Sequence, residues 1–486
     1  MNMEIEENSV LLTDSPRSKS DPDSKTHVDI NEALENAGFG CGTLLYTGGS
    51  FLVGSMGGSL LIVLSFIGPT LRCEWELSSF QLSCLNISTY ITQSVVSLIT
   101  APLGDRFGRR PLALTGSTGM LLFGMLCASV RSYWELLILR IVIGVFCGVG
   151  TSPAYVLSGE VPPKRYRALA LSGMCLAFGV GIVITGGIAY LTLGLLGWTW
   201  RSLLLGSSLF FSPCVIFFIV TRESPRYHYY NGDFESAEKT IKILYKMNGK
   251  ENFDLKLVKM PEDMNAFYND KSKAFSLREV VTILRDSDNI RNTFILLVIS
   301  ILTYFNYFFY GYSMPRILNE GYCTGFNVTV VDSCYYDQSV LFNVEAVNIA
   351  EPVGLIFTLL VLDKFGRRSF FTAVAIAGIV LSVPLYFCIH RYFLTTFLFL
   401  VYPVIAGLGL SPVLLISELM PTVIRATMGS LMLAAAGVGS VSAMFIADFV
   451  LLAGPRYVIA IFQVVLIAFT VSIGMLNKET VGADLT

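Results

Sequence analysis

Charged residues are scarce in this sequence. Asp, Glu, Lys and Arg make up 14% of its 486 residues, whereas about a quarter of an ordinary soluble domain is charged. The net charge of −2 leaves no excess of positive charge, so the basic face that a nucleic-acid partner requires is missing. The composition therefore excludes a soluble globular domain and predicts no nucleic acid among the partners.

Catalytic signatures are also missing. The chain has three histidines, at positions 27, 228 and 390, and no HExxH, GxSxG or Walker A motif. Such motifs bring the groups of a catalytic or metal site together. The sequence therefore predicts no enzyme activity, no cofactor and no metal site.

Residues 1–41 lack the apolar core of a cleaved signal peptide. They are largely polar, with acidic and Ser/Pro-rich stretches, and we expect them to form a disordered cytosolic tail. Within this segment, residues 7–12 read ENSVLL, a pattern typical of acidic dileucine sorting signals on endosomal and lysosomal membrane proteins. An ordinary disordered tail is the alternative. The expected location is a vesicular or endolysosomal membrane, with the plasma membrane as the other choice.

Apolar residues make up 53% of the chain and gather in long runs. Each run approaches or exceeds the roughly 20 residues that a membrane-spanning helix needs. They cover residues 44–69, 82–103, 112–131, 134–157, 168–195, 202–220, 293–315, 339–362, 369–389, 392–417, 428–453 and 457–476. Helices are expected because a backbone in lipid must satisfy its own hydrogen bonds and no run alternates like a barrel strand. The fold class predicted is an all-α membrane protein with twelve transmembrane helices in two six-helix halves.

A polar stretch separates the two halves. Residues 42–220 form the predicted N-terminal half and residues 293–476 the C-terminal half. Between them, residues 221–292 are too polar to span a membrane and include an amphipathic helical pattern at 237–245. We expect this stretch and the final residues, 477–486, to be cytosolic.

The orientation follows from the positive residues in the short loops, because Lys and Arg are retained on the cytosolic side. With both termini cytosolic, the short cytosolic loops carry most of these residues. They are Arg106, Arg109, Arg110, Lys164, Arg165, Arg167, Lys364, Arg367, Arg368 and Arg425. The inverted orientation would place this richer set outside, so both termini are predicted to be cytosolic.

Two similar loops lie between the second and third helices of each half. The first carries Gly104, Asp105, Arg106, Gly108, Arg109 and Arg110, and the second carries Asp363, Gly366, Arg367 and Arg368. A glycine permits a tight turn, and the arginines can bridge to carboxylates. Copies at matching positions indicate an internal repeat and a conformational gate. Topogenic charge is the alternative.

Carboxylates end the fourth and tenth helices in a similar way. Glu160 is followed by Arg165, and Glu418 by Arg425. Each glutamate is expected to pair with the arginines of a Gly-Arg-Arg loop when the cytosolic side is closed, and a rocking motion between the halves would break these pairs. The alternative is again a topogenic role.

The chain resembles the sugar and organic-ion branch of the major facilitator superfamily. Both Gly-Arg-Arg loops, the Glu-xx-Pro helix ends and the RESPRY segment at 222–227 carry this resemblance. More narrowly, EALENAGFG at 32–40 and CEW at 73–75 resemble the synaptic vesicle 2-related proteins. The resemblance implies a major facilitator fold whose first, fourth, seventh and tenth helices line a central cavity.

The function expected from this resemblance is secondary active transport of a small organic solute or ion by alternating access. A co-transported proton or cation and membrane lipid are the other expected partners. A non-transporting membrane receptor or scaffold of the same fold is the alternative.

Ionisable residues inside spans are costly and mark functional sites. The candidates are Arg140, Glu345, Glu351 and Asp448. Glu351 is nearest to mid-membrane, and the following proline can kink its helix, so it is a candidate hinge or proton site. A carboxylate satisfied by a neighbouring helix is the alternative. The first helix has only small residues and Met56 at 54–59, where the subgroup carries an acidic residue. This departure leaves proton coupling through that helix unsupported and favours close helix packing.

The seventh helix is rich in aromatic residues. Tyr304, Tyr307 and Tyr310 advance about one turn at a time, with Asn306 among them. This face suits a flat organic solute or a cation, and an aromatic belt at the membrane interface is the alternative.

The loop after the seventh helix carries Cys323, Cys334 and the sequon at Asn327. On the non-cytosolic side these residues predict a disulfide and a glycan. Free thiols and an unused sequon are the alternative. Asn86 also begins a sequon, but it lies in a span, where no glycan is added.

Overall fold

The computed structural model describes residues 27–250, 256–258, 287–319, 337–362, 364–387, 391–419 and 422–476. These residues contain twelve helical segments long and apolar enough to cross a membrane, which confirms the twelve predicted runs. The protein is therefore an all-α membrane protein. Within the described part, the exception is a parallel pair of two-residue strands, β1 (His27–Val28) and β2 (Lys256–Leu257).

The N-terminal half contains six spans. They are α2 (Cys41–Glu74), α3 (Ser79–Phe107), α4 (Arg109–Leu126) with η1 (Cys127–Ser129), α5 (Tyr133–Glu160), α6 (Lys164–Ala189) with η2 (Tyr190–Leu195), and α7 (Trp200–Phe210) with α8 (Pro213–Val220). Pro213 stands at the start of α8. The sixth span breaks there because proline cannot continue the hydrogen bonds of the preceding helix.

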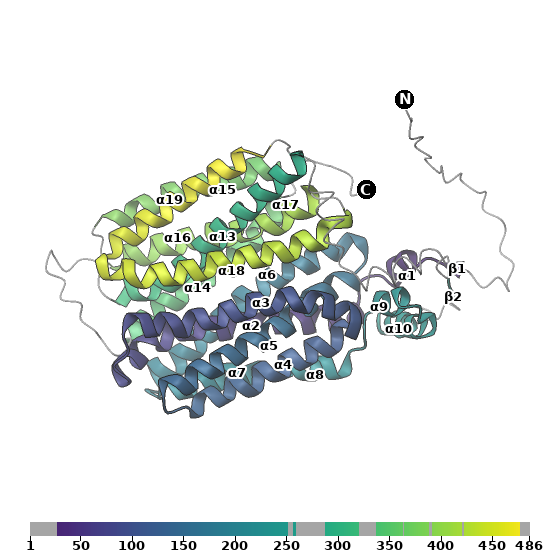
Figure 1. Ribbon diagram of the computed structural model, residues 1–486, viewed down its shortest axis with the longest axis horizontal. Helices are drawn as coiled ribbons and strands as arrows, with labels where there is room; N and C mark the ends of the chain where they lie inside the picture. Colours follow the sequence, from purple (N-terminus) through teal and green to yellow (C-terminus); the bar gives the residue numbers. More distant parts are fainter. Residues whose placement is uncertain are drawn as a thin grey trace.

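The C-terminal half contains the other six spans. They are α13 (Ser287–Asn319), α14 (Gln338–Leu362), α15 (Arg367–Ser382) with η3 (Val383–Tyr386), α16 (Arg391–Gly409) with α17 (Ser411–Leu419), α18 (Thr422–Ala453) and α19 (Pro455–Gly474). The halves lie side by side (Figure 1), with α3 packed against α18 and α6 against α14.

The helix bundle has two ends. The basic-loop end carries the turn between α3 and α4 at Gly108, and the opposite end carries the start of α3 and the end of α13. Figure 1 shows a group of short helices beyond the basic-loop end. The basic-loop end is the one predicted to be cytosolic.

Small residues let α2 and α6 approach closely. A Cβ added at Gly58 would overlap the Phe178 carbonyl, and one added at Gly181 would overlap the Ser55 carbonyl. The small residues at 54–59 therefore serve helix packing, as the sequence favoured, and α2 is the most deeply buried of the spans.

Residues 27–41 were expected to belong to a disordered tail, and for these residues the expectation is wrong. They form β1, the helix α1 (Ile30–Ala37) and the start of α2. The apolar residues of α1 recur at helical spacing and are buried, because α1 packs on α10 (Phe234–Met247). This amphipathic period is a signal that the sequence contained. The predicted tail residues 1–26 lie outside the described residues.

The helix α10 confirms the amphipathic pattern at 237–245, and with α9 (Pro225–Tyr230) it lies beyond the basic-loop end (Figure 1). Asn248 joins it to the membrane helices. The Asn248 Oδ1 accepts from the Gly42 amide at 2.8 Å, and its Nδ2 donates to the Ala37 carbonyl at 3.0 Å. The part of the central polar segment that contains α9 and α10 is thus attached to the N-terminal half.

Candidate functional site

The first Gly-Arg-Arg loop is a tight turn. Gly108 has a φ of +94°, in the left-handed region that favours glycine, and its amide donates to the Gly104 carbonyl at 3.1 Å. A Cβ at Gly108 would overlap the Glu223 carboxylate. The glycine therefore permits both the turn and the approach of a carboxylate, as the loop pattern predicts.

Arg109 joins the two predicted acidic residues of this end. Its Nη2 lies 2.9 Å from Asp105 Oδ1 and 3.0 Å from Glu160 Oε1. The predicted arginine–glutamate contact thus exists, and it links α3, α4 and α5, which all belong to the N-terminal half.

The Arg110 side chain binds backbone carbonyls of its own half. Its Nε donates to the Phe218 carbonyl and its Nη2 to the Ile219 carbonyl, both at 2.9 Å. Its amide donates to Glu223 Oε2 at 3.0 Å. Sequence reasoning did not single out Glu223, although it stands inside the RESPRY segment. These contacts fasten α4 to the end of α8 within one half.

Two other predicted residues make local contacts. The Arg106 carbonyl accepts from the Tyr227 hydroxyl at 3.0 Å, and the Arg165 guanidinium lies over the Tyr166 ring, 5.7 Å from its centroid. Neither arginine pairs with a carboxylate among the described residues.

The second loop differs in its turn. Gly366 has a φ of −59° and precedes α15 directly. Arg367 Nη1 donates to the Leu362 carbonyl at 2.7 Å, and Arg368 Nη2 donates to the Gly474 carbonyl at 2.6 Å. These bonds also stay within one half. Asp363 and the side chains of Glu418 and Arg425 lie outside the described residues, so the second gate pair stays a prediction.

Glu351 lies in the middle of α14 and is 1% exposed. It accepts a short hydrogen bond from the Tyr307 hydroxyl of α13, and its Oε2 has no partner among the described residues. A Cβ at Gly179 of α6 would lie 2.7 Å from Glu351 Oε1. This carboxylate therefore sits in the C-terminal half, directly against a helix of the N-terminal half.

The predicted tyrosine face of α13 points into the protein. Tyr310 is buried, and its hydroxyl donates to the Leu398 carbonyl at 2.7 Å. The ring of Tyr304 stacks on that of Phe308, with the ring centroids 6.5 Å apart. Asn306 is 2% exposed, with its Oδ1 unpartnered in the described part of the chain. These placements favour an interior site over an aromatic belt at the lipid interface.

A small, largely apolar cavity lies where the halves meet. Tyr90 of α3 and Phe178 of α6 contribute from the N-terminal half, and Tyr307 and Phe308 of α13 contribute with Tyr402 of α16 from the other. The Tyr90 and Phe308 rings meet edge to face with centroids 4.8 Å apart. Of the three predicted tyrosines, Tyr307 lines this cavity, whereas Tyr304 and Tyr310 do not.

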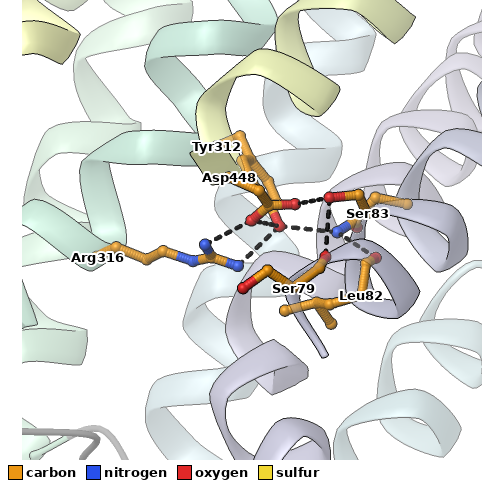
Figure 2. Close-up of polar contacts among 7 residues, drawn as sticks. Ser79, Leu82, Ser83, Tyr312, Arg316 and Asp448 are labelled. Atoms are coloured by element: carbon orange, nitrogen blue, oxygen red, sulfur yellow. Dashed lines mark hydrogen bonds and ion pairs between the residues drawn. The ribbon is translucent and has the colours of Figure 1, made fainter. Parts of the chain in front are cut away.

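A polar cluster surrounds Asp448 at the opposite end (Figure 2). Arg316 Nη1 donates to Asp448 Oδ1 at 2.6 Å, and the Tyr312 hydroxyl donates to the same oxygen at 3.0 Å. From α3, Ser83 donates a short hydrogen bond to Asp448, and Asn86 Nδ2 donates to the Tyr312 hydroxyl at 3.0 Å. Helices α13 and α18 of one half are thereby joined to α3 of the other.

Sequence reasoning flagged Asp448 alone in this cluster. Arg316 follows an aromatic run and reads as a residue at the end of a span, and Asn86 was considered only as a sequon. Asn86 is 2% exposed. The partners could not be found because they come from two helices, α3 and α13, that are far from α18 in the chain.

Cys73 lies at the C-terminal end of α2, at the opposite end of the bundle, and is disulfide-bonded. The six other cysteines that the structure describes are free. Disulfides persist in oxidising compartments, so this bond agrees with the prediction that the opposite end is not cytosolic. Cys323, Cys334 and Asn327 lie outside the described residues, and their disulfide and glycan stay predictions.

A family model described as sugar (and other) transporter matches residues 43–486. The chain belongs to this transporter family. Among its relatives, svop-1 of Caenorhabditis elegans is 28% identical over 89% of this chain and 82% of that protein. Synaptic vesicle 2-related protein of Rattus norvegicus is 25% identical over 97% of this chain and 84% of that protein. The resemblance stated from the motifs is thereby confirmed.

Solved transporters share the fold. The inward-open structure of the xylose transporter XylE from E. coli has a TM-score of 0.67 and 17% identity, over 90% of this chain and 97% of XylE. At this identity the likeness shows the fold alone. The protein is accordingly a multi-pass membrane protein with a major facilitator fold, in a family of transporters.

Proposed function

We propose that this protein is a secondary active transporter that moves a small organic solute or ion by alternating access. The Asp448 cluster is the observation that carries the proposal. It holds the two halves together at the opposite end through the hydrogen bonds of Ser83 and Asn86. Such a contact between two rigid bodies can form in one state and break in the other.

Within the cluster, the ion pair lies inside one half and only hydrogen bonds join the two halves, which suits a reversible contact. The ion pair of Arg316 and Asp448 lies within the C-terminal half, so rocking leaves it intact. Only the two hydrogen bonds from α3 must break, and water can replace them. Breaking a hydrogen bond with this replacement costs about 0.5–3 kcal/mol, and the upper part of this range applies to the Ser83 bond to a carboxylate. Separating a buried ion pair costs about 3–5 kcal/mol.

Glu351 is the candidate site for a coupled proton or cation. The structural neighbour XylE is a proton:xylose symporter, and the first span of the present protein has no carboxylate at 54–59. Glu351 Oε2 is buried without a described hydrogen-bond partner, and Oε1 of the same carboxylate lies against Gly179 of the other half. A buried carboxylate there changes its surroundings when the halves move, which is the property that coupling requires.

The membrane is proposed to be vesicular or endolysosomal. Support comes from the ENSVLL segment at 7–12 and from the name of the synaptic vesicle 2-related relatives. Surface labelling of cells that express the tagged protein tests this proposal. A predominantly plasma-membrane signal that is unchanged by Leu11→Ala with Leu12→Ala would contradict it.

Locking the cluster tests alternating access directly. The variant Ser83→Cys with Asp448→Cys should form a disulfide between α3 and α18, and uptake into proteoliposomes should stop under oxidising conditions and return after reduction. The reduced variant controls for loss of the carboxylate. A matched pair within one half, Ser59→Cys with Thr185→Cys, replaces hydroxyls 2.6 Å apart and should leave uptake unchanged.

The uptake assay needs a panel of sugars, organic anions and organic cations, each with and without a proton gradient. Saturable uptake of one class supports the proposal. Failure of every class, with a folded and ligand-responsive protein, would favour a receptor or scaffold. Uptake that persists in the oxidised, fully cross-linked variant would contradict alternating access.

A further inference from the structure

Arg140 is a cation buried inside the N-terminal half. It lies in α5 and is 1% exposed. Its Nη1 donates to the Leu60 carbonyl of α2 at 2.7 Å, whereas its Nε and Nη2 have no hydrogen-bond partner among the described residues. A guanidinium stays charged in proteins. Two of its donor nitrogens are therefore unused in a place that water does not reach easily.

The surroundings of Arg140 do not neutralise it. Its titratable neighbours are Tyr90, Cys127 and Cys147, and none of the ion pairs within the described residues includes Arg140. The nearby stretch of α2 is built of small residues and Met56 without a carboxylate. A buried charge is strongly unfavourable unless an opposite charge accompanies it.

Tyr90 connects Arg140 to the cavity between the halves. It is a titratable neighbour of the Arg140 side chain and one of the residues that line the cavity. Its hydroxyl also has no partner among the described residues. Arg140 and Tyr90 thus both have unsatisfied donors, and Tyr90 lines the cavity together with the rings of Phe178 and Phe308.

We propose that the transported solute is an organic monoanion, whose acidic group is bound by Arg140 with Tyr90 and whose apolar body lies among the aromatic rings. This inference rests on the proposed function and deepens it. A guanidinium binds a carboxylate through two parallel hydrogen bonds, which matches the two free nitrogens. The rings that line the cavity supply the apolar contact that such a body needs.

An organic cation bound by Glu351 is the rival solute, and the chemistry of the two side chains favours the anion. Glu351 already accepts from Tyr307, and a carboxyl group can shed its charge by taking up a proton. A guanidinium cannot shed its charge. The permanent charge of Arg140 therefore requires an anion more strongly than Glu351 requires a cation.

Ligand binding to the purified full-length protein tests this inference without transport. Thermal unfolding is measured with benzoate, phenylacetate and indole-3-acetate, each compared with its amide, with benzylammonium and with chloride at equal ionic strength. At least one carboxylate should stabilise the protein, while its amide, benzylammonium and chloride should not. Arg140→Gln should weaken that carboxylate at least about tenfold, because a charge-assisted pair is lost.

Two variants complete the design. Arg140→Lys keeps the charge without the planar fork and should bind the carboxylate with intermediate affinity, which covers the case in which Arg140→Gln does not fold. Arg201→Gln removes another arginine of the same half, one that contacts Glu74 at 3.4 Å, and should bind like the wild type.

Binding by benzylammonium in place of the carboxylates, equal binding of acid and amide, an equal response to chloride, or binding unchanged in Arg140→Gln would each overturn the inference. So would the absence of binding by every carboxylate. Uptake of a sugar or cation without carboxylate binding would refute the inference and leave the transporter proposal standing. Carboxylate binding without uptake of any solute would do the reverse.

Discussion

The two ends of the helix bundle use similar polar side chains for different connections. At the basic-loop end, Arg109 and Arg110 bind partners in their own half. At the opposite end, Ser83 and Asn86 of the N-terminal half bind Asp448 and Tyr312 of the C-terminal half. The described contacts of Arg109 and Arg110 thus lie within one half, whereas those of Ser83 and Asn86 join the two halves.

This difference decides what each contact can control. A contact within one rigid half stabilises that half equally in every state of the transporter, so it does not shift an equilibrium between states. A contact between halves exists in one state and not in the other, and its free energy enters that equilibrium directly. Variants at the two ends test this distinction, beginning with the largest expected effect.

Asp448→Asn should lower the free energy of unfolding by about 3 kcal/mol, because it removes the carboxylate of a largely buried ion pair. Thermal unfolding of the purified protein measures the change. The comparison is Asp105→Asn at the basic-loop end, where the carboxylate is largely exposed beside Arg109. Equal losses in the two variants would contradict the contrast between the ends.

Ser83→Ala should shift the protein toward a state that is open at the opposite end. It removes a hydrogen bond to a charged acceptor, which contributes about 1.5–3 kcal/mol, or tenfold or more in population. A Met444→Cys reporter in the cavity, labelled by an impermeant reagent from that side, measures the shift. Ser88→Ala is the control, since Ser88 bonds only within α3, and equal labelling of both variants would refute the role of Ser83.

Arg109→Ala tests the gate predicted from the sequence. The gate requires that loss of Arg109 shift the carrier away from its outward-open state and expose the cytosolic ends of α5 and α17. The side chains of Arg109 and Glu160 are 13% and 16% exposed. A pair that broke on opening would therefore change the population at least roughly fivefold, whereas a pair confined to one rigid half would change it little. Cysteine labelling at those ends checks it, with Arg110→Ala as the control. Unchanged labelling in a folded protein would restrict Arg109 to a role within its half.

The smallest effect on the equilibrium between states is expected from the loop between α13 and α14. The modifications predicted for this loop would show on which side of the membrane it lies. Cys323 and Cys334 should be bridged and Asn327 glycosylated if the opposite end is not cytosolic. Glycosidase treatment should lower the mass of the wild type and not that of Asn327→Gln, while the buried Asn86 should be unmodified.

Non-reducing peptide mapping would separate a Cys323–Cys334 bridge from one that involves Cys73, which is disulfide-bonded. Free thiols at positions 323 and 334 would contradict the predicted bridge. Protease cleavage of terminal tags from the opposite face of the membrane would contradict the orientation.

Most of the fold could be predicted because it depends on local properties of the chain. A run of apolar residues becomes a helix in lipid wherever it lies, and Gly108 permits its turn through its own backbone freedom. The helix α1 was missed because it has only eight residues, half of them polar, within a largely polar stretch of sequence. Its helical period was present, but its stability depends on packing against α10.

The candidate site was predicted in part. Glu351 and Asp448 were singled out because a carboxylate in an apolar run is visible without a structure, and so was the pairing of Arg109 with Glu160. Which groups surround Asp448 was not visible. Arg316 and Asn86 carry no signal of their own, because each is ordinary for its position in the chain.

The sequence by itself determined that this chain crosses a membrane with twelve helices and carries a repeated basic loop, because run length, composition and repeats are properties of neighbouring residues. The tertiary structure decided which polar groups meet across the halves. Ser83 and Asp448 are 365 positions apart, and they touch because α3 packs against α18. That packing depends on the shapes of both helix surfaces together, and no single stretch of sequence contains it.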